Sequence, residues 1–76
     1  MKQILEFIAK ALVDNPDAVT VNEIYDGHTT VLELRVAEED MGKVIGRQGK
    51  IARAIRMIIK AAALKQNRKV IVEIVQ

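Results

Sequence analysis

The residues with the clearest chemical potential are two glycines that enclose two long polar side chains, Gly46-Arg47-Gln48-Gly49. Glycine lacks a Cβ, so the backbone can turn sharply here and another chain can lie close to it. A helix is expected to begin directly after this loop, and the free amide groups and positive dipole of a helix start favour an anion. Basic residues surround the loop: Lys43, Arg47, Lys50 and Arg53. These features together predict contacts with the phosphates of a nucleic acid.

The loop has two other interpretations. Any pair of helices can be joined through glycine, and an isolated G-x-x-G is common by chance. Nucleotide hydrolases also place a glycine-rich loop beside lysine, but their G-x-x-x-x-G-K-[ST] pattern requires glycine at Val44 and serine or threonine at Ile51. The spacing therefore excludes a nucleotide-hydrolysing loop, whereas the first interpretation has to be judged from the flanking sequence.

Charge is divided unevenly along the chain. Residues 1–40 contain nine acidic and three basic residues, a net charge of −6, and residues 41–76 contain nine basic residues and one acidic residue, a net charge of +8. Such asymmetry is typical of a surface that meets an anionic partner, with nucleic acid first among the candidates. The alternative is an ordinary solvated helix face.

Hydrophobic spacing and turn residues predict six elements in a single domain of residues 1–76. We expect helices over 3–13, 38–44 and 50–65, and strands over 19–25, 30–36 and 70–75, with turns at Asp14–Asp17, Asp26-Gly27 and Gln66-Asn67. On the long helix the expected core face is Ile51, Ile55, Ile58, Ile59 and Ala62, and on the first helix it is Ile4, Leu5, Ile8, Ala11 and Leu12. The order α-β-β-α-α-β predicts an α+β fold. Two helices join the last two strands, so these strands can lie parallel in a three-stranded mixed sheet with three helices packed on one face.

This order and the loop together resemble the KH domain, in which an apolar pair, here Val44-Ile45, precedes G-x-x-G and a helix between two strands. The arrangement is similar to the bacterial type II form, with residues 30–75 as the β-α-α-β core and residues 1–29 as an added helix and strand. Residues 42–56 resemble the KhpA-like (YlqC-like) family of single-KH-domain RNA-binding proteins. One departure is Ala52, where many KH domains carry a large aliphatic residue, although the neighbouring Ile51 can supply volume.

The resemblance implies binding of single-stranded RNA, about four nucleotides long, beside the loop. Val44, Ile45 and apolar residues of the 30–36 strand are expected to line the base side. Phe7 and Tyr25 are the only aromatic residues, so stacking on rings is not a main contribution. The expected contacts are Lys43, Val44, Ile45, Gly46, Arg47, Gln48, Gly49, Lys50 and Arg53. The family also implies an RNA chaperone or post-transcriptional regulator linked to cell elongation and envelope synthesis.

The second hypothesis is a protein-interaction module. Met57, Ala61 and Leu64 form an additional apolar stripe at helical spacing on the 50–65 helix. This stripe either serves self-association or is covered by the first helix. The resemblance favours a homodimer, and it also implies pairing with a larger KH-containing protein of the KhpB, Jag or EloR type.

Catalysis and metal binding are not expected. His28 lies in a turn with no identifiable acid or nucleophile, there is no cysteine, and consecutive Glu38, Glu39 and Asp40 are better explained by helix capping than by a metal site. No cofactor is implied. Lacking a signal-peptide pattern or an apolar run of roughly 20 residues, the protein is expected in the cytoplasm.

Overall fold

The order of elements matches the sequence prediction. The structure is a computed structural model, which describes residues 1–75. Its helices and strands are α1 (Lys2–Leu12), β1 (Thr20–Asp26), β2 (Thr29–Arg35), α2 (Met41–Ile45), α3 (Lys50–Lys65) and β3 (Lys69–Ile74). Single turns of 3-10 helix lie at Pro16–Ala18, Glu38–Asp40 and Arg47–Gly49. None of the helices within residues 1–75 has both the length and the apolar character needed to span a bilayer.

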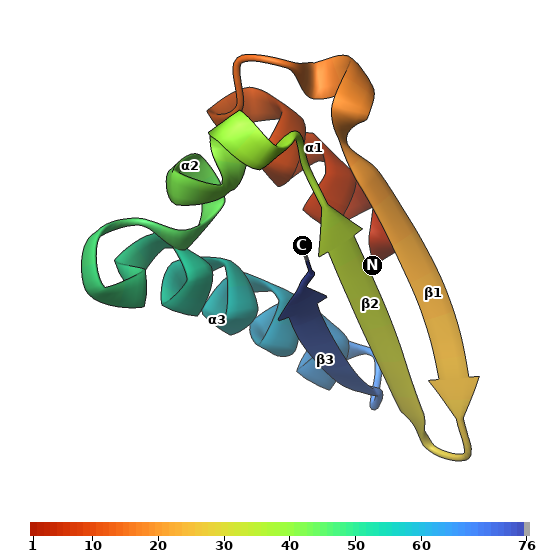
Figure 1. Ribbon diagram of the computed structural model, residues 1–76. Coiled ribbons are helices and arrows are strands. Elements are labelled where there is room, and N and C mark those ends of the chain that lie inside the picture. The colour runs from red at the N-terminus through yellow and green to blue at the C-terminus, as the bar shows by residue number, and fades with distance from the viewer. Residues whose placement is uncertain (76) are drawn as a thin grey trace.

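The sheet is mixed, as expected. Its strand order is β1-β2-β3, with β1 antiparallel and β3 parallel to β2. Asp26 pairs with Thr29, so Gly27-His28 forms the two-residue hairpin turn, and the positive φ of +62° at Gly27 alone is typical of a type II′ turn. The crossover through α2 and α3 returns the chain in parallel, and the helices lie together on one face of the sheet (Figure 1). The predicted α+β class is confirmed.

The core lies between the sheet and the helices. Every second residue of β2 points into it, and Leu32 and Leu34 are completely buried. Leu5, Val44 and Ile59 meet them there, also without exposed surface. The alternation of β2 thus fixes which sheet face the helices cover.

The buried face of α3 differs from the prediction, most clearly at Ile58, and Ala62 is only partly buried. Ala52, Ile55, Ile59 and Ala63 are buried, while Ile58 is 50% exposed. The prediction that Ile58 belongs to the core was wrong, because the sheet covers the arc centred on Ile55 and Ile59 and leaves the neighbouring arc uncovered. The small residue at Ala52 lies inside the domain, and the adjacent Ile51 packs against the core while partly exposed.

On α1 the buried arc is also narrower than expected. Leu5 and Ala9 are buried, whereas three residues that were predicted to face inward are exposed, namely Ile4 (40%), Leu12 (37%) and Ala11. Phe7 is 75% exposed. The 11-residue helix α1 therefore buries only about one side chain per turn against the rest of the domain.

The end of α3 follows a defined capping pattern. Asn67 adopts a left-handed conformation with φ +55°. Its N–H donates to the carbonyl oxygen of Leu64 at 3.1 Å, and the N–H of Arg68 donates to that of Ala63 at 2.9 Å. These two bonds are those of a Schellman motif, and they turn the chain from α3 directly into β3.

Candidate nucleic-acid interface

Gly46 ends α2 and starts the loop. Its φ is +76°, a conformation that residues with a side chain rarely adopt. A Cβ at this position would lie 2.6 Å from Cγ1 and 2.9 Å from the backbone nitrogen of Ile51. Glycine is therefore required here for both backbone conformation and space, and its absent side chain lets α2 and α3 approach each other closely.

The remainder of the loop is a single 3-10 turn. The N–H of Gly49 donates to the carbonyl oxygen of Gly46 at 3.2 Å and closes the turn. Gly49 has φ +76°, and Gln48 also adopts a left-handed conformation, with φ +57° and ψ +25°. Such a conformation costs a residue other than glycine about 1–2 kcal/mol. Gln48 and Arg47 are both exposed, so the turn presents two long polar side chains to solvent.

α3 begins at the end of this turn without a side-chain cap. Gly49 occupies the N-cap position, and within residues 1–75 no side chain accepts a hydrogen bond from this helix start. The partial positive charge of a 16-residue helix is thus directed at solvent beside the loop. This geometry suits a phosphate group, as the sequence predicted.

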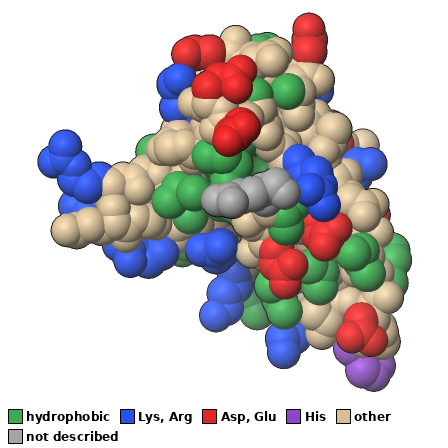
Figure 2. Space-filling model, viewed as in Figure 1, with side chains coloured by type: hydrophobic (Ala, Val, Ile, Leu, Met, Phe, Trp, Pro, Cys, Tyr) green, Lys and Arg blue, Asp and Glu red, His purple; other side chains and the backbone are tan. Residues whose placement is uncertain are grey.

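The basic side chains around the loop are available to a ligand. Arg47, Lys50 and Arg53 are exposed, and among residues 1–75 none of them forms an ion pair with a carboxylate. Figure 2 shows basic side chains gathered at the left and lower sides of the view, over the loop and α3, while many of the acidic ones lie at the top. Acidic and basic residues, which are separated along the sequence, are therefore also largely separated on this face of the molecule.

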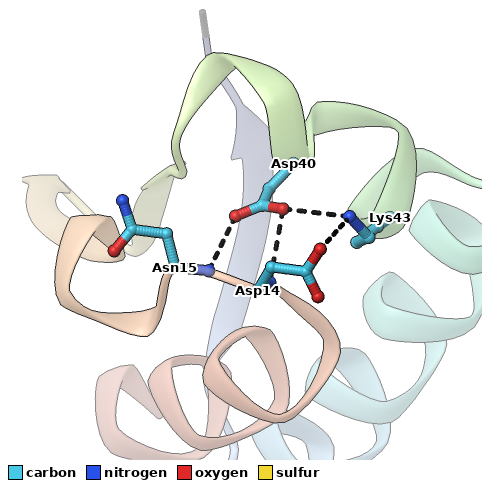
Figure 3. Close-up of polar contacts among 4 residues, drawn as sticks. All are labelled: Asp14, Asn15, Asp40 and Lys43. Carbon is cyan, nitrogen blue, oxygen red and sulfur yellow. Dashed lines mark hydrogen bonds and ion pairs between the residues drawn. The ribbon is translucent and has the colours of Figure 1, made fainter.

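Lys43, in contrast, is bound within the protein. Its Nζ lies 2.7 Å from Oδ2 of Asp14 and 3.2 Å from Oδ1 of Asp40. Asp40 is completely buried and also accepts hydrogen bonds from the backbone N–H groups of Asn15, at 3.0 Å, and Asp14, at 3.3 Å (Figure 3). The predicted capping role of Asp40 was wrong, because its carboxylate ties the end of α1 to α2 instead of bonding its own helix start.

These contacts shift the pKa values of both Asp40 and Lys43. Burial by itself raises the pKa of Asp40, but the N–H groups of Asn15 and Asp14 and the ammonium group of Lys43 outweigh it and hold that pKa below its ordinary value of 3.8. Hydrogen bonds to Asp14 and Asp40 raise the pKa of Lys43 above its ordinary value of 10.5, against a smaller opposing effect of burial. Lys43 and Asp40 therefore remain charged across the neutral range.

The structure also corrects the expected base side of the site. Val44 has no exposed surface, and neither do Leu32 and Leu34 of the neighbouring strand, so none of the three can contact a base. They form the core beneath the loop. Ile45 is partly exposed and is the one member of the apolar pair that a ligand can reach.

The additional apolar stripe of α3 is open to solvent. Met57 is 70% exposed, Leu64 is 66% exposed, and Ala61 between them is also exposed. The half-exposed Ile58 lies beside them. The alternative in which the first helix covers this stripe is therefore wrong.

The sequence reading missed a groove between the second half of α3 and β3. It has a volume of about 370 Å³ and an apolar floor that includes Leu64 and the β3 segment 70–72. Four basic residues line it: Arg56, Lys60, Arg68 and Lys69. Lys60 lies one helical turn after Arg56 on α3, whereas Arg68 and Lys69 follow the Schellman motif that ends the helix. This motif turns the chain back so that the two pairs of basic residues line one groove.

Comparisons with known proteins agree with this geometry. The family model described as KhpA/KhpB, KH domain, matches residues 2–74. RNA-binding protein KhpA of Caldanaerobacter subterraneus subsp. tengcongensis is 63% identical over 75 residues, which cover 99% of this chain and 100% of that protein. RNA-binding protein KhpA of Aquifex aeolicus is 50% identical over 76 residues, covering 100% of this chain and 96% of that protein.

A solved structure shares the fold. The crystal structure of Aquifex aeolicus Era bound to GDP·AlF4⁻ superimposes with a TM-score of 0.60 at 20% sequence identity. The match covers 96% of this chain and 28% of the Era chain, and at this identity it shows the fold alone. The family match over nearly the whole sequence and the glycine loop between α2 and α3 lead to one conclusion: the chain belongs to the KhpA/KhpB family of KH domains.

Proposed function

We propose that this protein binds single-stranded RNA, about four nucleotides long, at the loop between α2 and α3. The observation that carries the proposal is the loop itself, where the positive-φ turn, the start of α3 and the exposed side chains of Arg47, Lys50 and Arg53 lie together. Relatives that match over the whole chain are named RNA-binding proteins, which supports the same ligand. The proposal assigns no catalytic step to the chain.

The contact residues have different roles in this proposal. Arg47, Lys50 and Arg53 neutralise phosphates, while the backbone of Gly46 and Gly49 lets the RNA lie close to the loop. Gln48 donates hydrogen bonds from its amide, and Ile45 offers an apolar contact to a base. Val44 supports the loop from behind through the core, and Lys43 does so through its ion pairs with Asp14, in the turn after α1, and with Asp40. Contacts made mainly to the RNA backbone give little sequence selectivity.

A double substitution tests the loop. Arg47→Asp with Gln48→Asp places two carboxylates where phosphate is expected, so binding of fluorescent single-stranded RNA should weaken by at least about tenfold. Each lost phosphate contact should also reduce the magnitude of the log–log salt slope by about 0.7. Lys65→Asp, an exposed charge change at the far end of α3, is the matched control. Equal affinity and an equal salt slope for the loop variant and the wild type would reject the loop as the site.

The resemblance to KhpA-like proteins also supports a proposal for the role of the protein in the cell. We place the protein in the cytoplasm as an RNA chaperone or post-transcriptional regulator linked to cell elongation and envelope synthesis. Crosslinking in cells followed by sequencing of the bound RNA tests this role. Recovery of transcripts for cell-envelope functions by the wild type but not by the loop variant is the expected outcome, and identical RNA recovery by both proteins would contradict it.

A second candidate function is protein association through the stripe of Met57, Ala61 and Leu64. The observation that favours it is the exposure of these two large apolar side chains, 70% for Met57 and 66% for Leu64, in the described part of the chain. A homodimer, or pairing with a larger KH-containing protein of the KhpB, Jag or EloR type, would bury them. Met57→Asp and Leu64→Asp should each give folded monomers in sedimentation, and a wild-type monomer at high micromolar concentration would end this proposal.

A further inference from the structure

The short helix α2 carries the glycine loop but cannot fix its own orientation. It has five residues, far fewer than the roughly 12–15 that an isolated helix needs to be stable in water. Its last residue, Ile45, is followed directly by Gly46, so any change in the direction of α2 is passed on to the loop. Contacts with neighbouring elements therefore have to hold α2 in place.

Two of these contacts are made by packing. Val44 has no exposed surface and belongs to the core. Gly46 lies against Ile51, where the absence of a Cβ lets α2 and α3 meet. A third attachment of α2 is polar and joins it to the segment that follows α1.

The polar attachment is centred on the buried carboxylate of Asp40, which directly precedes α2. Its Oδ2 accepts a hydrogen bond from the N–H of Asn15 at 3.0 Å, and its Oδ1 accepts one from the N–H of Asp14 at 3.3 Å and one from Nζ of Lys43 at 3.2 Å (Figure 3). Lys43 follows three residues later in the chain, so the two side chains lie on the same side of α2. Both oxygens are thus held by groups on two separate segments of the chain.

Lys43 differs in this respect from the other cations near the loop. To bind a phosphate, its ammonium group would have to leave both Asp14 and Asp40. The carboxylate of Asp40 has no exposed surface, and a buried charge without its counterion is strongly destabilising. Lys50, by contrast, is exposed and forms no ion pair among residues 1–75.

We propose that Asp40 is a positioning residue for RNA binding, which fixes the direction of α2 and thereby the place of the glycine loop beside the start of α3. Lys43 serves as the counterion of Asp40 and contacts no phosphate. This inference rests on the RNA site proposed at the loop. A loop that is already in place loses less conformational freedom on binding, so loss of the network should weaken RNA binding without removing a phosphate contact.

The salt dependence of RNA binding separates a positioning residue from a phosphate contact. Lys43→Met removes the charge at a side chain that is 42% exposed, and the affinity for fluorescent single-stranded RNA should fall by about threefold to tenfold with an unchanged log–log salt slope. Lys50→Met is the matched comparison, and it should reduce the magnitude of the slope by about 0.7. An equal reduction of the slope in both variants would make Lys43 a phosphate contact and overturn the inference.

Variants at Asp40 test the buried carboxylate itself. Asp40→Asn keeps the shape of the side chain and should weaken RNA binding by a similar factor, with a salt slope no smaller than that of the wild type. Asp17→Asn, at an exposed acid outside the network, should leave the affinity unchanged.

A further variant controls for general loss of stability. Val21→Ala truncates a buried side chain of β1, at the sheet edge away from β3, and destabilises the fold outside the network. It should bind RNA as the wild type does, at a temperature at which thermal unfolding shows every variant to be folded. A loss of affinity as large as that of Asp40→Asn would assign the effect to stability alone and overturn the inference.

Amide hydrogen exchange without RNA reports on the loop directly. The N–H of Gly46 donates to the carbonyl oxygen of Gly42 at 2.9 Å, and the N–H of Gly49 donates to that of Gly46 at 3.2 Å. Exchange of these two amides, relative to the amides of β2, should become faster in Asp40→Asn and stay unchanged in Val21→Ala. Unchanged relative exchange in Asp40→Asn overturns the inference.

The two measurements also separate this inference from the proposed function. RNA binding that the Arg47→Asp, Gln48→Asp substitutions do not reduce rejects the loop as the RNA site, and amide exchange then still decides whether Asp40 holds the loop. Faster loop exchange together with an unchanged RNA affinity would limit the network to the fold and overturn its role in binding.

Discussion

Gly46 and Ile51 lie so close together that a Cβ on the glycine would stand 2.6 Å from Cγ1 of the isoleucine. Ile51 belongs to the first turn of α3 and packs against the core, so it cannot move without displacing other side chains. The loop that we propose as the RNA contact is thus held by the packing of two helices as well as by its own turn.

Gly46→Ala should therefore destabilise the protein by about 2–4 kcal/mol, combining the cost of the left-handed backbone with that of overpacking. Gly42 is the matched control. It lies within α2 with open space around it and a helical backbone, so Gly42→Ala should raise the free energy of unfolding by about 0.5–1 kcal/mol. Chemical denaturation of both variants measures the difference, and equal effects at the two positions would contradict the packing argument.

Gln48→Gly should increase stability by up to about 1 kcal/mol, because it relieves the left-handed strain at a smaller entropic cost. Asn67→Gly, at the other left-handed position and remote from the loop, should gain less, since asparagine tolerates this conformation. Denaturation midpoints of the two variants test the strain. A destabilised Gln48→Gly protein would show that the glutamine side chain supports the fold.

Stability should depend on pH at both ends of the scale. The pKa of Asp40 is lowered on folding, so its stabilising contribution is complete above its ordinary value of 3.8 and is lost as pH falls through the lower folded value. The pKa of Lys43 is raised, so its contribution is complete below 10.5 and is lost as pH rises through the higher folded value.

Asp40→Asn should lower the thermal midpoint at neutral pH and flatten the acid side of the stability profile. The same substitution at exposed Asp17, which forms no ion pair among residues 1–75, is the control. Thermal scans between acidic and neutral pH compare the two. An acid limb in Asp40→Asn as steep as that of the wild type would show that other carboxylates govern it.

The two faces of α3 should respond differently to truncation. Ile59→Ala removes a completely buried side chain and should cost about 2–5 kcal/mol. Ile58→Ala, at a half-exposed position, should cost about 1 kcal/mol or less. Urea denaturation of the pair checks the corrected core face, and comparable losses would mean that Ile58 is buried in solution, for example by a second copy.

Added salt should have opposite effects on RNA binding and on self-association through α3. RNA binding should weaken with added salt, with a slope of about −0.7 for each phosphate engaged. α3 carries five basic residues and no acidic one, so two copies that meet through this helix repel each other, and their association should strengthen as salt screens the charges. Fluorescence titration and sedimentation over the same salt series measure both trends, and association that weakens with salt would point to a different interface.

The order of the elements, the mixed sheet and the glycine loop were all predictable from the amino-acid sequence. These features rest on local information: alternation in β2, turn residues such as Gly27 and Asn67, and the spacing of two glycines before a helix. The charge division between the two halves of the chain also appears at the surface, because the charged side chains other than the buried Asp40 remain at least partly in solvent.

Which of the predicted residues are exposed to a ligand depends on how the helices pack against the sheet. Periodicity shows that α3 has apolar sides, but only the packing of the sheet shows that Ile59 is covered and Ile58 is not. Lys43 is engaged by Asp14, 29 positions earlier in the sequence, and Val44 is buried by elements distant in the chain. Contacts of this kind depend on how elements distant in the sequence pack together, which the local spacing of residues does not predict.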